Sequence, residues 1–378
     1  MLDLNTTRDK IDKIDCDIVK LFEARMELTK EVAEYKTKTG KAILDREREK
    51  SKLAALQNLV QNEYNRYPVQ ELFTQIMSMS RKYQYRLVPS YSGDLSFSLI
   101  DSLELTESSQ IVCFGEPGSY TEQAAQNFFG LHVSCFHSNS FKEIMEKVQS
   151  GEMDYGVLPI ENSSTGGILD TYDLLLSYNN FIIGEHVLKI DHALVGLEGS
   201  SLSELKSVYS HPQALLQCAG FFETHPNILP HEFFSTSASA KKILEDGDKT
   251  QAAIAGKCAA LEYGLKVLED HLNFENSNAT RFIIITNKKQ YLSYADKVSI
   301  CFELPHESGT LYTMLSHFIY NHLNMTKIES RPILGRPWEY RFFVDFQGNL
   351  KESGVKNAIN GIKEEAADLK ILGNFSTQ

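Results

Sequence analysis

The sequence predicts a multidomain protein with an all-α N-terminal part, a two-lobed α/β middle part and a smaller α+β C-terminal part of ferredoxin-like order. Three observations support this prediction. A chain of 378 residues is long enough for two or three domains. Its composition, 42% apolar and 23% charged, is that of a globular protein. The spacing of apolar residues also changes along the chain. It predicts first a heptad helix, then alternating strands and helices, and last the order β-α-β-β-α-β.

Charge and cysteine usage restrict the compartment and the partners. A net charge of −12 argues against nucleic acid as a partner, because binding phosphates needs a basic surface. The six cysteines are scattered without a C-x-x-C pair, as is typical of a reduced, cytoplasmic protein. The charged, helical N-terminus is not that of a signal peptide, and the longest apolar runs are too short to span a bilayer. We therefore expect a cytoplasmic protein without membrane or nucleic-acid partners.

Motifs for common cofactors are missing from the sequence. The histidines follow no metal-binding spacing, and none lies near a cysteine at zinc-finger spacing. Neither a Walker sequence nor the glycine-rich dinucleotide fingerprint occurs. We therefore expect no metal and no nucleotide cofactor.

Residues 4–35 follow a seven-residue apolar repeat, which predicts a long helix that packs along a seam with another helix. Arg25 occupies a core position in the middle of this seam. A buried guanidinium without a partner costs several kcal/mol, so Arg25 should either pair with a buried carboxylate or bind an anionic ligand. The apolar residues of the seam are Ile11, Ile14, Ile18, Leu21, Leu28, Val32 and Tyr35.

Two further cations lie on the same predicted helix. Lys36 follows Arg25 by eleven residues, about 20° beyond three full turns, and therefore shares its face. Arg8 precedes Arg25 by seventeen residues and lies about 100° around the helix. It therefore points elsewhere, for example into the site of a neighbouring subunit.

The next two helices carry further polar candidates. Asp45, Arg48 and Glu49 have the i, i+3, i+4 spacing of one helical face. A solvated face with weak surface ion pairs explains that spacing equally well. A third helix is expected to start near Pro68 and places Ser80 and Gln84 one turn apart.

The stretch at 156–168 organises the middle of the chain. An apolar run ends in a polar turn, Glu161-Asn162-Ser163-Ser164-Thr165, and a helix is predicted from Leu169. A helix cap needs one such side chain, whereas this turn has five, so a site for an anionic ligand is the stronger interpretation. Gly166 and Gly167 would allow another backbone or a ligand to approach closely.

Strands alternate with helices on both sides of this stretch, which predicts a largely parallel sheet with its ligand site at the carboxyl ends of the strands. A strand is expected at 111–114 and another over 186–196. Residues 88–108 have no sustained period and are expected to form a connector, with room for a short helix. The region after 297 follows the order β-α-β-β-α-β.

The helical segment resembles the all-helical class of chorismate mutases. The resemblance implies that two arginines hold the substrate's carboxylates, that Lys36 and Gln84 reach the ether oxygen, and that an acidic pair including Glu49 reaches the ring hydroxyl. Because that family interleaves its long helices in a dimer, Arg8 would come from the partner chain. The implied substrate-binding residues are Arg8, Arg25, Lys36, Asp45, Arg48, Glu49, Ser80 and Gln84.

The α/β segment resembles prephenate dehydratases. Its motifs are G-S-Y-T-E (118–122), L-P-I-E-N-S-S-T-G-G-I (158–168), S-H-P-Q-A-L-L-Q-C (210–218), S-T-S-A-S-A (235–240) and N-A-T-R-F (278–282). The resemblance implies two α/β lobes, like those of periplasmic binding proteins, with prephenate bound between them. The implied substrate-binding residues are Asn162, Ser163, Thr165, Gln217, Ser237, Thr280 and Arg281.

Two residues are candidates for protonating the departing hydroxyl of prephenate. The resemblance implies Thr280, whose hydroxyl donates hydrogen bonds but is a poor acid. Glu161 in a dry cleft could have a raised pKa and act as the acid. Arg281 could instead form a structural ion pair, and for His211 a structural hydrogen bond is favoured over a catalytic role.

The C-terminal region resembles the ACT domain of prephenate dehydratases, which binds phenylalanine between paired domains. The implied effector-binding residues are Gly309, Thr310, Leu311, Glu329, Ser330 and Arg331. The family motif Glu-Ser-Arg-Pro is present at 329–332. The other family motif is usually Gly-Ala-Leu-Val, and here Thr310 and Tyr312 replace its alanine and valine. The predicted domains are 1–88 (mutase), 89–108 (linker), 109–288 (dehydratase, second lobe about 187–270) and 297–378 (ACT).

Together the resemblances imply a bifunctional enzyme of L-phenylalanine biosynthesis. It would convert chorismate to prephenate and then prephenate to phenylpyruvate, CO2 and water, under feedback inhibition by L-phenylalanine, as a homodimer or higher homo-oligomer. An alternative is a mutase fused to a catalytically inactive ligand-sensing α/β module. A fusion to prephenate dehydrogenase would need the dinucleotide fingerprint that the chain lacks.

Overall fold

The computed structural model describes residues 3–88, 95–103, 105–106, 108–131, 133–273 and 277–377. The chain forms two compact units. Unit 1 comprises the described residues of 1–95 and 300–370, and unit 2 those of 96–299 and 371–378. Among the described residues, no helix is long and apolar enough to cross a membrane.

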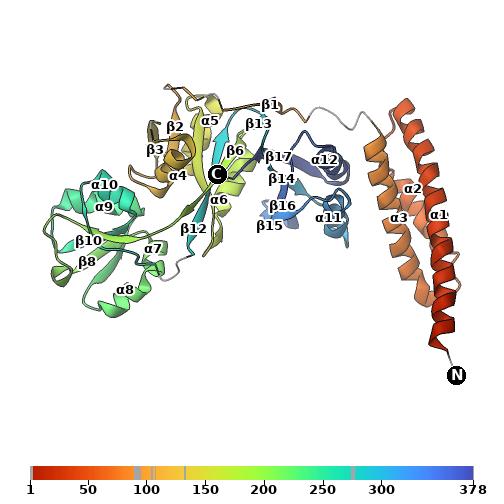
Figure 1. Cartoon of the computed structure of the whole chain (residues 1–378), viewed down its shortest axis with the longest axis horizontal. Helices are drawn as coiled ribbons and strands as arrows, with labels where there is room; N and C mark the ends of the chain where they lie inside the picture. Colours follow the sequence, from red (N-terminus) through yellow and green to blue (C-terminus); the bar gives the residue numbers. More distant parts are fainter. Residues whose placement is uncertain are drawn as a thin grey trace. The chain divides into compact units, whose positions relative to one another are not determined.

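The N-terminal part of unit 1 consists of helices, drawn in red and orange in Figure 1. They are α1 (Leu4–Thr39), α2 (Arg46–Gln57), the short 3-10 helix η1 (Glu63–Asn65) and α3 (Arg66–Leu87). Asp3 caps α1 by accepting from the backbone N–H groups of Asn5 and Thr6, and Gly40 ends the helix at a φ of 66°. The predicted long helix and the start of the third helix near Pro68 are therefore confirmed.

The apolar seam of α1 is exposed. Among the described residues of this helix, only Thr29 and Ala33 are buried. The seam side chains are between 43% (Val32) and 71% (Leu21) exposed. The helix that the heptad predicts as a packing partner is therefore not supplied by the described part of this chain.

The C-terminal elements follow the predicted order and lie in the sheet as β15-β16-β14-β17. This is the element order of the ferredoxin-like motif. Helices α11 and α12 contact each other and α3. The elements are β14 (Lys297–Glu303), α11 (Thr310–Tyr320), β15 (Met325–Ile333), β16 (Arg336–Gln347), α12 (Ser353–Glu365) and β17 (Asp368–Phe375).

Unit 2 contains two lobes, each with its own sheet. The first lobe has the strand order β6-β12-β4-β2-β3, with β5 (Gly166–Gly167) paired to β4, and Gly373 of β17 pairs with Ile182 of β6. Its strands are β2 (Ile111–Phe114), β3 (Cys135–Ser138), β4 (Tyr155–Asn162), β6 (Phe181–Lys189) and β12 (Ala279–Thr286), and its helices are α4 (Tyr120–Phe129), α5 (Phe141–Ser150) and α6 (Leu169–Ser177).

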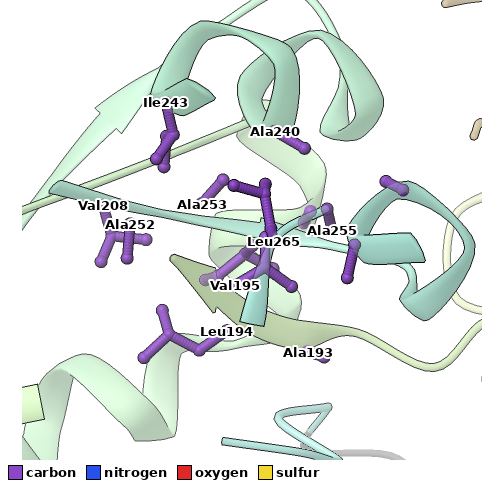
Figure 2. Close-up of a cluster of buried hydrophobic side chains, with 14 of the residues drawn as sticks. Ala193, Leu194, Val195, Val208, Ala240, Ile243, Ala252, Ala253, Ala255 and Leu265 are labelled. Atoms are coloured by element: carbon purple, nitrogen blue, oxygen red, sulfur yellow. The ribbon is translucent and has the colours of Figure 1, made fainter. Parts of the chain in front are cut away.

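The second lobe has the strand order β11-β7-β10-β8-β9. Figure 2 shows its core, in which small alanines of β10 and larger side chains such as Val195, Val208 and Ile243 pack between the sheet and its helices. The strands are β7 (Ala193–Gly196), β8 (Ser207–Ser210), β9 (Leu229–Glu232), β10 (Gln251–Ala255) and β11 (Lys266–Glu269); the helices are η3 (Leu202–Glu204), α7 (Pro212–Gln217), α8 (Ala219–Thr224), α9 (Thr236–Asp246) and α10 (Lys257–Glu262).

Two predictions about the sheets are wrong. The single strand expected over 186–196 is divided into β6 and β7, which belong to different sheets, so the chain crosses to the second lobe at 190–192. The sheets are also mixed rather than largely parallel. Strand β12 runs antiparallel to both β6 and β4, and β7 runs antiparallel to β10 and β11. The reason is topological, because the chain leaves the first lobe along β6 and re-enters it in the opposite direction along β12.

The predicted connector lies partly outside the described residues. Its described part contains a strand and not the short helix that the prediction allowed. This strand, β1 (Ser98–Ile100), pairs in parallel with β13 (Gln290–Leu292) in unit 2.

Candidate active sites

The predicted residues on α1 and α3 meet in unit 1. The Arg25 guanidinium donates a hydrogen bond to the Ser80 hydroxyl, which itself donates to the carbonyl of Ile76 at 2.9 Å. Ser80 and Gln84 are only 5% and 6% exposed. Arg25 is half-buried, and burial lowers its pKa against the opposing charge of Glu49. The seam arginine therefore faces a polar site rather than the apolar stripe.

Gln84 and Lys36 have polar atoms available to a ligand. Gln84 Nε2 donates to the Ser80 carbonyl at 3.2 Å, while the buried Oε1 has no hydrogen-bond partner among the described residues. Lys36 Nζ donates to the Ile43 carbonyl at 2.5 Å. Burial lowers the pKa of the Lys36 ammonium, and nearby carboxylates, chiefly that of Glu364, oppose this effect.

The expected helical face of Asp45, Arg48 and Glu49 is only partly present. Asp45 precedes α2 and caps it, accepting from the Arg48 backbone N–H at 3.0 Å, because a short carboxylate satisfies an otherwise unpaired donor at the helix start. Glu49 lies within α2 and accepts from Arg81 Nη1 at 2.7 and 2.6 Å. Asp45 and Arg48 are exposed, as is Arg8 on α1.

Arg81 was not identified from the sequence. It is 6% exposed, and besides Glu49 it binds Glu365 of α12 through Nε at 2.9 Å. Desolvation alone would raise the pKa of Glu365, but the His317 and Arg81 side chains together lower it to about 2. From the sequence, Arg81 could have been recognised only by its position directly after Ser80, because its partner Glu365 lies 284 residues away.

A cavity of about 430 Å³ lies between the two lobes of unit 2. Asn162, Thr165 and Thr280 line it from the first lobe, and Gln217 and Ser237 line it from the second. All five were predicted from the sequence as substrate-binding residues. Apolar side chains such as Phe114, Phe141 and Phe282 line much of the rest.

Thr280 and Asn162 lie opposite each other on the antiparallel strands β12 and β4. Asn162 Nδ2 donates to Thr280 Oγ1 at 2.9 Å, although 118 residues separate the two. The same Nδ2 is 2.9 Å from Asn278 Oδ1 and 3.2 Å from the Ala279 carbonyl. Pairing of the two strands therefore brings the motifs of residues 158–168 and 278–282 into one site.

Three other predicted residues lie beside the cavity rather than on its wall. Arg281 makes ion pairs with Glu161 (3.3 Å) and with the buried Glu185 (3.1 Å). Ser163 Oγ donates to the Ser277 carbonyl and accepts from the Ala279 N–H. The structure thus shows the ion pair that was the alternative interpretation of Arg281, and Glu161 is one of its partners.

The helix predicted from Leu169 is confirmed as α6 (Leu169–Ser177), and the polar turn before it is a tight hairpin. Gly166 and Gly167 form β5 and pair back onto Asn162 and Glu161. A φ of 81° at Gly166 suits this reversal. His211 caps α7, its Nδ1 accepting from the Gln213 N–H at 3.2 Å, as expected for a structural role.

Tyr120, His192 and Asn278 were not identified as individual site residues. Tyr120 Oη is 2.9 Å from His192 Nδ1, and His192 Nε2 is 3.0 Å from Gln217 Oε1. Burial lowers the pKa of the His192 imidazole. A sequence signal existed for His192, since it lies in the short polar break that separates two apolar runs.

One group of side chains in the described residues has the composition of a metal site, namely Asp191, Asp270 and His271. These side chains are already paired. His271 Nδ1 lies 2.9 Å from Asp191, and Lys257 Nζ lies 2.5 Å from Asp270. Exposed acidic groups with such partners do not indicate a metal.

The predicted effector residues occupy two places in unit 1. Gly309 precedes α11 at a φ of 84°, and Thr310 and Leu311 line a cavity of about 90 Å³. Glu329, Ser330 and Arg331 lie on β15, the outermost strand of its sheet, away from that cavity.

Comparisons with known proteins relate both parts of the chain to known families. Family models described as chorismate mutase type II and prephenate dehydratase match residues 7–85 and 111–290. The bifunctional chorismate mutase/prephenate dehydratase of Buchnera aphidicola (subsp. Schizaphis graminum) is 35% identical, covering 100% of this chain and 97% of that protein. The enzyme of the same name from Aquifex aeolicus is 32% identical over 99% and 98%. The crystal structure of prephenate dehydratase from Arthrobacter aurescens in complex with L-Phe is 31% identical and covers 71% of this chain and 89% of that one, with a TM-score of 0.66.

Proposed function

Since the chain belongs to the family of bifunctional chorismate mutase/prephenate dehydratases, we propose that its N-terminal helices rearrange chorismate to prephenate and that the cavity between its two α/β lobes converts prephenate to phenylpyruvate. The family relation extends over the whole chain, so both activities are those of this protein. The assignment of residues to each reaction is the proposal.

For the mutase, the helices supply cations and donors around a polar site. The Claisen rearrangement of chorismate is unimolecular and needs no nucleophile. Catalysis consists of holding a compact conformer and stabilising the charge that develops on the breaking ether. Arg25 would hold a carboxylate, and Lys36 Nζ would donate to the ether oxygen. Gln84 would donate to the same oxygen through the second hydrogen of Nε2, since the first is directed to the Ser80 carbonyl. Glu49, held by Arg81, would accept from the ring hydroxyl.

For the dehydratase, the observation that carries the proposal is the direction of one hydrogen bond. Because Thr280 Oγ1 accepts from Asn162, its own hydrogen remains available to donate into the cavity. We assign it to the departing hydroxyl of prephenate. Gln217, Ser237 and Thr165 would hold the rest of the substrate, and loss of CO2 would be driven by aromatisation of the ring.

The test is turnover by the purified chain in EDTA without added nucleotide, following chorismate consumption and phenylpyruvate formation. Both should proceed at enzymatic rates. If prephenate accumulates and no phenylpyruvate forms, the cavity is a sensor and the inactive-module alternative replaces the dehydratase assignment.

The domain limits and the regulatory module belong to the proposal as well. We retain 1–88 for the mutase, 109–288 for the dehydratase and 297–378 for an ACT domain. The β-α-β-β-α-β order supports the last assignment, and the Arthrobacter aurescens relative was solved with L-Phe.

L-Phenylalanine is expected to bind this protein and to inhibit it. Glu329 is the acidic residue of the predicted effector motif and should pair with the ammonium group of the ligand. Glu329→Ala should therefore raise the Kd for L-phenylalanine about tenfold or more, as for a lost hydrogen bond to a charged group. Calorimetry with L- and D-phenylalanine measures this. The absence of heat, together with activity that is insensitive to L-phenylalanine, would exclude the effector role.

We propose that the open seam of α1 pairs with the same helix of a second copy. Leu21 is 71% exposed at the centre of a heptad that requires a helical partner. Leu21→Glu would place an unpaired carboxylate in that interface and should weaken the dimer by roughly 100-fold or more. The mutase should lose activity in parallel, because Arg8 of one chain would then no longer reach the site of the other.

Lys20→Glu is the matched control. It introduces the same side chain one residue earlier, about 130° from the centre of the seam, where Lys20 is solvated beside Asp17. Sedimentation velocity should find a dimer for the wild type and for this control, and monomers for Leu21→Glu. A fully active monomeric wild type would exclude the shared site.

A further inference from the structure

A chain of side-chain hydrogen bonds lies beside the cavity between the two lobes. One backbone N–H group determines which atom donates in each of these bonds. The Ser164 N–H can only donate, and it lies 3.0 Å from Asn162 Oδ1. The Asn162 amide is therefore oriented with Nδ2 as the donor, toward Thr280 and Asn278 Oδ1. The Ala279 carbonyl, which can only accept, lies on the same side at 3.2 Å and requires the same orientation.

The orientation of the Asn162 amide also determines which atoms of the next side chains donate and which accept. Asn278 Oδ1 is occupied as an acceptor, so Asn278 Nδ2 is its donor, and it lies 3.0 Å from Gln217 Oε1. The other atom at Gln217 Oε1 is His192 Nε2, at 3.0 Å. Two acceptors cannot face each other at that distance, so His192 Nε2 carries a hydrogen.

His192 keeps this arrangement in either protonation state. It is 3% exposed, and burial favours the neutral ring. The neutral Nε2–H tautomer leaves Nδ1 as an acceptor, 2.9 Å from Tyr120 Oη. In this tautomer the single hydroxyl hydrogen of Tyr120 is shared between His192 Nδ1 and the Asp191 carbonyl, which lies 2.8 Å from Tyr120 Oη. Protonation would reverse only the bond to Tyr120, because Nε2–H remains the donor to Gln217.

We propose that His192, as its Nε2–H form, is a positioning residue of the dehydratase: with Asn278 it holds Gln217 Oε1 away from the substrate, so that Gln217 Nε2 donates into the cavity beside Thr280. This inference rests on the proposed dehydratase function of the cavity. Among the described residues Gln217 Nε2 has no partner, and Gln217 lines the cavity together with Thr280. Two donors, the Thr280 hydroxyl and the Gln217 amide, thus face an anionic substrate.

The experiment measures kcat/KM for prephenate in a double-mutant cycle of His192→Phe and Gln217→Ala, with His192→Gln as a fourth variant. His192→Phe keeps a buried ring but removes the donor, so the Gln217 amide can rotate and present its oxygen. We expect kcat/KM to fall about tenfold, the size of one hydrogen bond. In a Gln217→Ala background the same change should have no further effect, because His192 acts through Gln217. His192→Gln, which offers an amide donor near the position of Nε2, should restore most of the activity.

Two controls separate this idea from a loss of folding and from failure of the proposed function. His225→Phe changes another ring of the second lobe, stacked on Phe221 at 4.5 Å between ring centroids, and should leave prephenate turnover unchanged. Chorismate turnover by each variant reports an intact unit 1, and restored activity in His192→Gln shows that unit 2 folds without the imidazole. The positioning role is wrong if His192→Phe and Gln217→Ala act additively, or if His192→Phe has wild-type kcat/KM. A wild type without phenylpyruvate formation would instead remove the proposed function itself.

Discussion

Thr280→Val should lower kcat for conversion of prephenate to phenylpyruvate by roughly 100- to 1000-fold, the usual effect of removing one transition-state donor. Valine has nearly the same shape and suits a strand, so the change removes the hydroxyl with little effect on packing. Thr280 is 8% exposed on the wall of the cavity, and its oxygen already accepts from Asn162. Thr280→Ser keeps the donor and should retain most of the rate.

The control for this prediction is Thr286→Val, at the far end of β12. Thr286 is 1% exposed and is not part of the cavity wall, so phenylpyruvate formation should not change. Chorismate consumption should be the same for all three variants. If Thr280→Val retains more than half of the wild-type kcat, the donor is another group, and Glu161, paired with Arg281 at 3.3 Å, becomes the first to test.

Lys36→Ala should lower kcat of the mutase about 1000-fold, because no other ammonium group is assigned to the breaking ether bond. Dehydration of supplied prephenate should be unaffected, since that site lies in unit 2. Lys38→Ala, two residues further along α1 and exposed, is the matched control. Stopped assays with chorismate and with prephenate measure the two activities separately. Loss of both activities in Lys36→Ala would indicate misfolding rather than a catalytic role.

The charge of Lys36 also predicts the pH dependence of the mutase. Only the protonated ammonium stabilises developing negative charge, so the rate should fall as pH rises through the pKa of Lys36. Burial lowers this pKa from its ordinary value of 10.5, against the pull of nearby carboxylates, so the fall should begin below that pH. The dehydratase rate serves as the reference over the same range.

Arg81 indicates how the mutase site depends on the C-terminal module within unit 1. Its guanidinium holds Glu49 on one side and Glu365 of α12 on the other. Taking one partner away from such a buried group is costly, because the remaining charge is left unpaired. Substitutions of Glu365 should therefore be assayed for mutase activity as well as for stability.

Much of the fold follows from local patterns. The heptad gave α1, the third helix begins close to Pro68 as predicted, and the C-terminal elements have the predicted order. These succeed because helix and strand periodicity depend on neighbours within a few residues. The second lobe was expected to begin near 187, but the division of residues 186–196 between β6 and β7 was missed, since strand-like residues look the same whether they stay in one sheet or pass to another.

The sequence by itself determined the motifs, the order of most elements and five polar residues of the cavity between the two lobes, because each motif is a short run with a distinctive chemistry. Only the tertiary structure decided what those residues do to one another. It paired Thr280 with Asn162, placed Arg281 in an ion pair with Glu161 and Glu185, and joined Glu49 to Arg81 and Glu365. Hydrogen-bond direction and ion pairing depend on atoms brought within about 3 Å by strand pairing and helix packing, and sequence spacing does not encode that proximity.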